Sequence, residues 1–183
     1  MRELSLNVLD VAQNSITAGA SLITLSVLED YASDTLEISI LDDGKGMSPE
    51  QLESVRDPFF TTRTTRKVGM GIPLFKLAAE QTGGKFDITS EVGVGTEVHA
   101  LFKTDSVDFT PIGDMCSTVV MLITMNLDRD FIYRRSYGEN EFTLDTRELK
   151  TILGEVPLDS PEVVEWLKGY ITENEQNLYG GAK

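Results

Sequence analysis

The sequence predicts an α+β protein: a two-layer sandwich in which helices cover a sheet, followed by a small C-terminal extension made of a β-hairpin and helices. Two observations carry this prediction. Apolar residues recur at helical spacing in some segments and alternate with polar residues in others. Those segments follow one another as helix, strands, helix, loop, helix and strands, an order typical of an α+β sandwich.

The composition is that of one globular domain with an acidic surface. The chain has 183 residues, of which 40% are hydrophobic and 25% charged, which is ordinary for a protein with a buried core. The net charge is −14, of which residues 1–104 carry −6 and residues 105–183 carry −8. A field of this sign repels nucleic-acid backbones and anionic lipids. We therefore expect neither nucleic acid nor a membrane as a partner, and a site for an anion must supply its own positive potential.

The single cysteine and the first residues bear on location. Cys116 excludes an intrachain disulfide and a multi-cysteine zinc site, and we interpret it as a small, partly buried hydrophobe. The opening MRELSLN has no long apolar region, so no signal peptide is expected. The longest apolar-leaning run, residues 117–125, is too short to span a bilayer. We expect a cytoplasmic protein.

The chain begins with a helix, two strands and a turn. Residues 4–16 lack Gly and Pro, carry apolar side chains at helical spacing and precede Gly19, which predicts a helix. Residues 22–28 read as a strand. Residues 36–41 alternate as a second strand, which ends at the turn DDGKG.

A short helix, a loop and a further helix come next. The segment SPEQLESV predicts a helix with Ser48 as its N-cap and Gln51 completing a capping box. After a loop, a glycine-closed helix and a pair of strands are expected at residues 73–81, 86–90 and 97–102.

The residue pattern changes beyond Lys103. We predict a strand at residues 119–125, a hairpin of residues 131–135 with 141–144, and helices at residues 147–153 and 161–174. For the apolar side of the last helix, core packing is favoured over a partner site; this side comprises Val163, Val164, Trp166, Leu167, Tyr170 and Ile171.

A polar stripe runs along the first helix. Asn7, Asp10, Asn14 and Thr17 recur at spacings of three and four and so share one face, opposite the apolar one. A solvated helix face is the plain interpretation. However, Asp10 and Asn14 lie one turn apart, and a carboxylate and an amide oxygen so placed suit a general base and a ligand for Mg²⁺.

Two glycine-rich turns follow strands. In LDDGKGMS, Asp42 ends a strand, where its carboxylate can accept a hydrogen bond from an exocyclic amine. Gly44 and Gly46 let a flat ring approach the backbone. In GVGTEVHALF, Thr96 enters a strand and can join Asp42 around a purine edge, although β-propensity alone also explains a threonine.

The segment DPFFTTRTTRKVGMGIPLFK combines aromatic, basic and glycine residues. Gly69 and Gly71 precede a helix, and backbone amides at a helix N-terminus form an anion site. No GK[ST] follows, so a P-loop is not supported. Basic side chains before the glycines would offset phosphate charge: Arg63, Arg66 and Lys67.

Each of these motifs is weak alone, but their order is specific. DxxxN on the first helix, then DxGxG, PFFTT, GxGI and GxGT resemble the N, G1, F, G2 and G3 boxes of the GHKL superfamily, which joins type II topoisomerases, heat-shock chaperones, histidine kinases and mismatch-repair ATPases. The resemblance covers residues 3–103. It implies a Bergerat fold with a mixed sheet, binding of ATP with Mg²⁺, and a division into residues 1–104 and a C-terminal extension, 105–183.

The resemblance also implies roles for single residues. Asn14 would bind the Mg²⁺ ion, Asp42 would accept from the adenine amine, and Thr96 would assist through a water molecule. Other residues would line the base (Gly44, Gly46 and Met47), hinge the lid over ATP (Phe59, Phe60 and Thr61) or bring backbone amides to the phosphates (Gly69, Met70, Gly71 and Ile72).

The chain departs from the family's pattern in three places. Asp10 stands where the family's ATPases usually carry Glu; a carboxylate at this position favours an activated water or hydroxyl nucleophile. Pro73 replaces the usual third glycine and excludes a phosphate contact from its own nitrogen. The lid, which runs to about Val68, is short, so slow turnover is expected.

Three functions stay open at this point. The first is an ATPase that regulates an unidentified protein partner. The second is a protein kinase acting in trans, like anti-sigma serine kinases or the catalytic part of a split histidine kinase. The third is an adaptor that binds ATP without turnover. Autophosphorylation on histidine is not expected, because His99, the only histidine, lies in a predicted strand and is interpreted as a core or edge residue.

Overall fold

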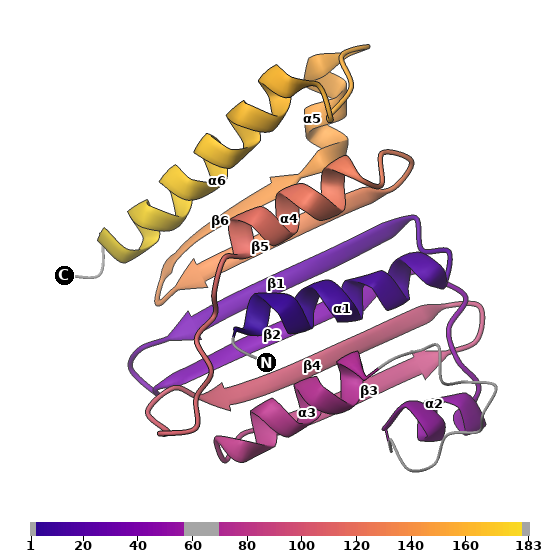
Figure 1. The fold of residues 1–183 in the computed structure, drawn as a ribbon, viewed down its shortest axis with the longest axis vertical. Coiled ribbons are helices and arrows are strands. Elements are labelled where there is room, and N and C mark those ends of the chain that lie inside the picture. The colour runs from indigo at the N-terminus through magenta and orange to yellow at the C-terminus, as the bar shows by residue number, and fades with distance from the viewer. Residues whose placement is uncertain (1–2, 57–69, 181–183) are drawn as a thin grey trace.

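The structure is a computed structural model that describes residues 3–56 and 70–180. Its centre is one six-stranded sheet in the order β3-β4-β2-β1-β5-β6 (Figure 1). The strands are β1 (Leu22–Asp30), β2 (Thr35–Asp42), β3 (Lys85–Glu91), β4 (Gly95–Lys103), β5 (Asp130–Tyr137) and β6 (Asn140–Asp145). In the described part the helices are α1 (Leu4–Thr17), α2 (Pro49–Arg56), α3 (Gly71–Gln81), α4 (Met115–Thr124), α5 (Thr146–Leu153) and α6 (Pro161–Gly180).

The sheet is mixed, as the family resemblance implied. Strand β1 pairs antiparallel with β2 on one side and parallel with β5 on the other. The remaining neighbours, β2 with β4, β3 with β4 and β5 with β6, are antiparallel. The C-terminal hairpin β5–β6 therefore lengthens the same sheet. The predicted α+β fold is confirmed.

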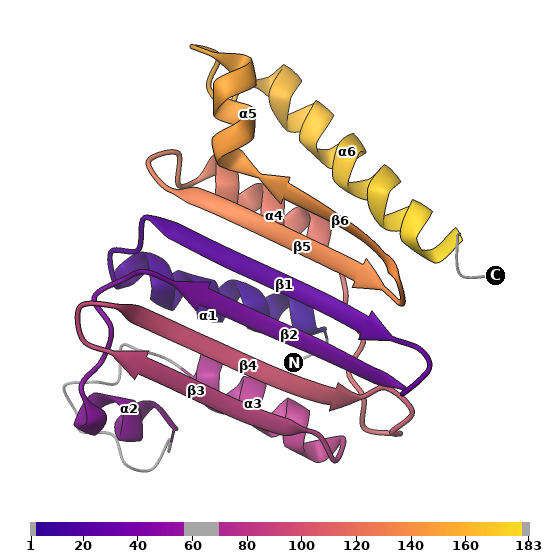
Figure 2. The ribbon, with the colours of Figure 1, turned by 180° about the vertical axis from the view of Figure 1, so that it is seen from behind.

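The two faces of the sheet differ. Helices α1, α3 and α4 lie on one face, as the two opposite views show (Figures 1 and 2). Alternate residues of β1, Ile23, Leu25 and Val27, are fully buried beneath them, because side chains along a strand point to opposite faces. The other face of β1 to β4 carries half-exposed and polar side chains, and no helix of the described part covers it there (Figure 2). We call this surface the open face.

Helix α1 packs more of its circumference than the stripe pattern predicted. Its first amide groups have no side-chain cap, but Leu4 and Ser5 donate to the carbonyls of Pro111 and Ile112, both at 2.8 Å. Asp10 and Thr17 are exposed, as expected of a polar face. Asn7 is not: it is fully buried. The plain interpretation of the stripe as a solvated face therefore does not hold at Asn7, because neighbouring helices cover this end of α1.

Helices α2 and α3 follow the predicted capping signals with one shift. Ser48 and Gln51 exchange the two hydrogen bonds of a capping box, at 2.9 and 3.2 Å. Helix α3 begins at Gly71 rather than Pro73. Pro73 thus occupies the first turn, where its missing N–H is tolerated.

The predicted strand at residues 119–125 is wrong, because helix α4 occupies this region. Its β-branched and apolar residues favoured a strand locally. Asp114, however, caps a helix by accepting from the Ser117 amide at 2.9 Å. Met115, Val119, Leu122 and Ile123 recur at helical spacing and are buried. Tertiary packing therefore overrides the local preference.

The remaining C-terminal predictions are confirmed, with longer elements. The hairpin forms as β5 and β6, and α5 and α6 follow, α6 running to Gly180. On α6, Val163, Leu167 and Ile171 are buried, whereas Trp166 is 49% exposed and stacks on Tyr170. No helix in the described ranges has the length and hydropathy needed to cross a membrane.

The structure places Cys116 and His99 in different environments. Cys116 is partly buried, as predicted, and burial raises the pKa of its thiol. His99 is neither in the core nor on an edge strand: it stands on the open face of β4, with Nε2 3.0 Å from Glu37 Oε2. His99 therefore lies on the open face of an inner strand, because side chains along a strand alternate between the two faces of the sheet.

Candidate functional site

Asp42 is a nearly buried carboxylate at the end of β2. Only 8% of the residue is exposed, and it stands in register with Ile23 of β1, on the side of the sheet that the helices cover. Its Oδ1 accepts from the Gly44 amide at 2.8 Å, and its Oδ2 accepts from Ser15 Oγ at 2.5 Å. Each carboxylate oxygen has a second lone pair, so both can accept again. The group is fixed and still has acceptor capacity.

Ser15 is a site residue that the sequence did not reveal. Its position in the apolar spacing of α1 made it look like a core residue, and it is indeed 4% exposed. Its hydroxyl donates to Asp42 from the helix side. A polar residue at an otherwise apolar position of α1 is the signal that would have found it, since buried hydroxyls need partners.

Asn14 and Asp10 lie beside this contact on α1. Adjacent helical residues project about 100° apart, so Asn14 projects in a different direction from Ser15, which reaches Asp42. Asn14 is half-buried and Asp10 is exposed. Neither side chain hydrogen-bonds to another described residue, so both retain their oxygens. Asn14 and Asp10 can therefore coordinate a metal ion or a water molecule near the hydrogen-bond acceptor Asp42.

The loop between β2 and α2 is pressed tightly between two other elements. Gly46 has φ +73°, and a Cβ there would lie 2.0 Å from the Glu91 carbonyl oxygen. A Cβ at Gly44 would lie 2.9 Å from the Ala18 Cβ at the end of α1. Lys45 donates to the Ala18 carbonyl and accepts from the Gly93 amide, at 2.9 and 2.7 Å. The two predicted glycines are therefore required by close packing.

A chain of hydroxyl contacts joins this loop to the start of β4. The Met47 amide donates to Ser90 Oγ at 2.8 Å, and Ser90 Oγ lies 2.7 Å from Thr96 Oγ1. Thr96 is the register partner of Asp42 across β2 and β4. The structure thus brings Asp42, Met47 and Thr96 together as predicted, and adds Ser90 as the residue that connects two of them.

The first turn of α3 contacts α1 at Asp10. A Cβ at Gly71 would lie 2.9 Å from the Asp10 Cβ, which explains the absence of a side chain there. Met70 is 51% exposed, Ile72 is buried, and no side chain caps this helix. Uncapped amides at a helix N-terminus attract anions. An anion held there would lie close to Asp10.

Part of the predicted site falls outside the described residues. These residues are the aromatic hinge and the basic segment with the first glycine of the GxG motif: Phe59, Phe60, Thr61, Arg63, Arg66, Lys67 and Gly69. Their predicted roles stay predictions.

The residues fit a metal that arrives with a phosphate ligand better than a resident one. No group of three or more His, Cys, Asp or Glu side chains in the described ranges is arranged to hold a metal ion. Asn14 offers one neutral oxygen beside the exposed carboxylate of Asp10. Mg²⁺ commonly takes only one or two protein ligands and completes its shell with phosphates and water. The donor set is consistent with that mode.

Comparison with known sequences matches the first half of the chain. A family model described as "Histidine kinase-, DNA gyrase B-, and HSP90-like ATPase" matches residues 1–106. Similar curated proteins include the sensor histidine kinase ZraS of Salmonella typhimurium, 34% identical over 88 residues, and the sensor protein SrrB of Staphylococcus aureus, 36% identical over 101 residues. These matches cover 48% and 52% of this chain but only 19% and 17% of the relatives, respectively.

Comparison with solved structures extends over more of the chain. The ADP-complexed ATPase domain of MutL from Aquifex aeolicus superposes with a TM-score of 0.51 at 14% identity, covering 84% of this chain and 69% of that one. The N-terminal domain of a DNA repair protein gives a TM-score of 0.54 at 16% identity, covering 85% and 58%. At these identities the likeness is one of fold.

Proposed function

Because this chain belongs to the family of histidine kinase-, DNA gyrase B- and HSP90-like ATPases, we propose that it binds ATP with Mg²⁺ between α1, α3 and the end of β2, hydrolyses it slowly, and thereby regulates a protein partner. The proposal places adenine at Asp42 and the phosphates at the N-terminus of α3. The match to the family model and the fold likeness to an ATPase domain solved with ADP support the first part.

The carboxylate of Asp42 is the observation that carries the proposal. An exocyclic amine needs an acceptor that is fixed and dry, and Asp42 is 8% exposed and oriented by Ser15 and Gly44. A hydrogen bond to a charged acceptor in such a place contributes about 1.5 to 3 kcal/mol. Gly44 and Gly46 let the adjoining loop pack tightly against Ala18 and Glu91, which fixes the backbone next to this carboxylate.

The phosphates and the metal are assigned to the neighbouring helices. The uncapped amides of Met70, Gly71 and Ile72 supply donors for phosphate oxygens. Asn14 would hold Mg²⁺, which neutralises phosphate charge when bound. Asp10 is an exposed carboxylate next to Gly71, and we assign it the role of accepting the proton of a water molecule that attacks the terminal phosphorus.

A second function is favoured by the relatives. ZraS and SrrB are a sensor histidine kinase and a sensor protein, and each shares sequence with about half of this chain. In this alternative the chain is a protein kinase in trans, and Asp10 would take the proton of a partner's hydroxyl group instead of that of water. Transfer of labelled phosphate to a partner distinguishes the two functions.

The binding test is calorimetry with Mg-ADP, which measures the site without turnover. Asp42→Asn keeps the shape but presents an amide donor to the exocyclic amine, so Kd should rise about 30-fold or more. Asp87→Asn is the matched control, because Asp87 is exposed on the open face of β3. Equal affinity of Asp42→Asn and Asp87→Asn for Mg-ADP contradicts the proposal.

The turnover test uses Asp10→Asn and measures phosphate release. We expect a loss of about 100-fold in rate with Mg-ADP affinity within about threefold of wild type. If turnover is unchanged, Asp10 is not the base. If the wild type binds ATP and releases no phosphate, the adaptor alternative replaces hydrolysis.

A further inference from the structure

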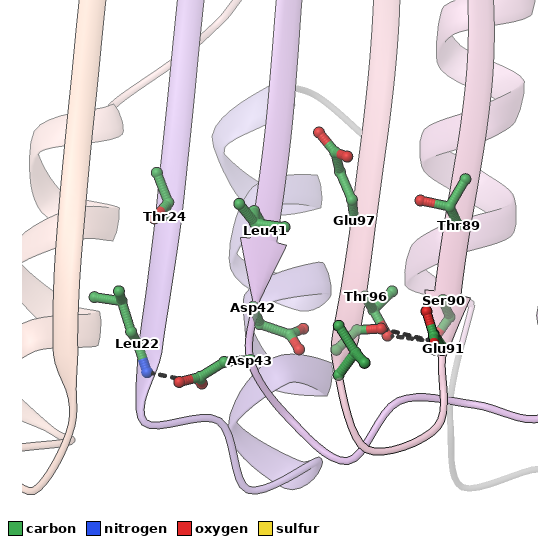
Figure 3. A pocket seen from close by; sticks show the side chains of 12 residues that line it. Leu22, Thr24, Leu41, Asp42, Asp43, Thr89, Ser90, Glu91, Thr96 and Glu97 are labelled. Carbon is green, nitrogen blue, oxygen red and sulfur yellow. Dashed lines mark hydrogen bonds between the residues drawn. The ribbon is translucent and has the colours of Figure 1, made fainter.

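The open face has a depression at the strand ends where Asp42 and Thr96 lie. A depression of about 440 Å³ crosses β1, β2, β4 and β3, and Figure 3 shows its side chains gathered at this end of the sheet. Its floor includes Leu22, Leu41 and Val94, of which Leu41 is 49% and Val94 60% exposed. Exposed aliphatic side chains in a hollow mark contact sites more often than isolated ones do. We call this depression the open-face groove.

The charged residues of the groove are all acidic. Asp43, Glu91 and Glu97 line it from three different elements, and Asp42, the carboxylate assigned above to adenine, also borders it. No Lys, Arg or His is among the lining residues of the described part. Asp43 is held as a carboxylate: although burial opposes ionisation, hydrogen bonds from Ser21 and Leu22 hold its pKa below the usual value. As the described residues contain no cluster able to hold a metal, these acids are not a cation cage.

We propose that the open-face groove docks a short extended segment of a partner protein that presents aliphatic and basic side chains together on one face, at every second position. Aliphatic side chains would cover Leu22, Leu41 and Val94, and arginine or lysine side chains would pair with the three carboxylates. Strands β1, β2 and β4 are paired on both sides, so a segment that crosses them binds through side chains rather than as an added strand. A second copy of this chain is disfavoured as the occupant, because each copy carries a net charge of −14.

The groove lies back to back with the proposed nucleotide site. Thr96 and Ser90 line it, and the Ser90 hydroxyl also receives the Met47 amide that would line adenine. Asp42 and Asp43 are neighbours in the chain and serve opposite sides. A partner in the groove therefore contacts the elements that shape the base site. Only this regulatory use rests on the proposed function; docking does not need nucleotide.

The test is fluorescence anisotropy with a labelled peptide of about eight residues, long enough to cross these strands. Every second position is in turn leucine and arginine, and serine fills the positions between. We expect saturable binding that weakens at least about fivefold between about 0.05 M and 0.5 M salt, because surface ion pairs are screened. Peptides in which glutamate replaces arginine, or serine replaces leucine, should bind at least about tenfold more weakly. Equal binding of the serine–arginine peptide overturns the aliphatic part of the proposal.

Matched charge reversals locate the peptide. Glu97→Lys should weaken binding at least about tenfold, whereas Glu141→Lys, an equal change on the same face of β6, should alter it less than about twofold. Leu41→Ser, at an exposed position, should also weaken binding without unfolding the protein. Equal effects of the two reversals would mean general attraction to an acidic surface and overturn the site.

Two controls separate the possible failures. Asn14→Ala, on the helix side of the sheet, should lose Mg-ADP affinity and keep the peptide, so loss of nucleotide binding alone leaves docking intact. Sedimentation of the protein without peptide tests self-association. A dimer that Glu97→Lys dissociates would give the groove to a second copy and overturn the proposed partner.

Discussion

The two halves of the sheet use buried polar groups in opposite ways. In the nucleotide half, formed by α1, β1 to β4 and α3, Asp42 is oriented by two donors and keeps acceptor capacity. In the C-terminal half, formed by α4, β5, β6 and α6, the buried cation Arg135 is surrounded by partners. The first arrangement leaves acceptor lone pairs for a ligand, and the second places a buried cation between carboxylates and hydroxyls of the protein.

The closed arrangement joins α6 to the sheet. Arg135 of β5 donates to the Tyr179 hydroxyl at 2.6 Å and lies 3.5 Å from Glu29 and 3.9 Å from Glu175. Tyr133 donates to Glu175 at 2.6 Å, and Tyr179 also donates to Glu29. Arg135 is 5% exposed. We call this set of residues the Arg135 network.

The comparison indicates how a ligand site differs from a buried polar cluster that only stabilises the fold. Burial and charge occur in both halves, so neither alone identifies function. What differs is whether opposite charges of the protein surround the buried charge: Glu29 and Glu175 lie beside Arg135, whereas no cation of the described part forms an ion pair with Asp42. Breaking each half should therefore affect different measurements.

The largest effect is expected from Gly95→Ala, which should disrupt the close contact between the start of β4 and the end of β2. Gly95 has φ +141°, and an added Cβ would lie 2.0 Å from the Asp42 carbonyl oxygen. We expect a loss of about 3 kcal/mol or more in the free energy of unfolding, measured in urea, and loss of Mg-ADP binding.

The control for Gly95 is two residues away. Gly93 also has a positive φ, +82°, but an added Cβ would meet nothing within 4 Å. Gly93→Ala should cost only about 1 kcal/mol of strain and leave nucleotide binding within about twofold. If the two alanine variants behave alike, close packing at Gly95 is not what shapes the site.

The next effect belongs to the Arg135 network. Arg135→Met leaves Glu29 and Glu175 without their cation, so we expect about 3 kcal/mol of lost stability in urea. The affinity for Mg-ADP, measured under folding conditions, should stay within about twofold, because Glu29 lies six residues along β1 from Ile23, the register partner of Asp42. Arg134→Met, at an exposed position next in the chain, is the control and should change stability by less than about 0.5 kcal/mol. A large loss of nucleotide affinity in Arg135→Met would join the two halves functionally.

The sequence predicted the nucleotide half better than the C-terminal half for a physical reason. Motifs such as DxGxG encode local backbone needs, including the positive φ of Gly46, which the residue types themselves announce. Asp42 and Thr96 were predicted together, and they are register partners. Their proposed roles stay predictions.

The failures arise where distant contacts decide. Residues 119–125 have strand-forming side chains, yet packing against α1 and α6 and the Asp114 cap make them helical. Ser15 was hidden because an apolar spacing does not say that β2 ends in a carboxylate opposite it. Asn7 was assigned to solvent for the same reason, since one helix does not show which neighbours cover it.

A smaller effect should follow from Ser15→Ala. Its hydroxyl orients Asp42 without touching adenine in the proposed complex, so its loss should raise the Kd for Mg-ADP about five- to tenfold, as expected for one hydrogen bond of about 1 to 1.5 kcal/mol. Ser26→Ala is the matched control: Ser26 is 6% exposed on β1 but faces the opposite side of the sheet. Calorimetry should find its affinity unchanged, and an equal loss in both variants would indicate a general loosening of the sheet.

The smallest effect is a change in alkaline stability carried by the network's tyrosines. Burial raises the pKa of Tyr133 and of Tyr179 above the ordinary value, since the charged phenolate is disfavoured there. In the unfolded chain a tyrosine ionises near pH 10. In the folded protein Tyr133 and Tyr179 still hold their protons at that pH. The stabilisation by the neutral hydroxyls is therefore fully present below about pH 10 and is lost as pH rises above it.

Tyr179→Phe removes one of these titrations, so the fall in the urea midpoint between about pH 8 and pH 11 should be shallower than in the wild type. At pH 8 the variant should itself be less stable by about 1 kcal/mol, because the hydrogen bonds to Arg135 and Glu29 are gone. Tyr31→Phe serves as control, since Tyr31 is 53% exposed, and it should keep the wild-type slope. If Tyr179→Phe keeps that slope as well, the hydroxyl of Tyr179 is not protected from ionisation by folding, and the network is more open to water than its packing indicates.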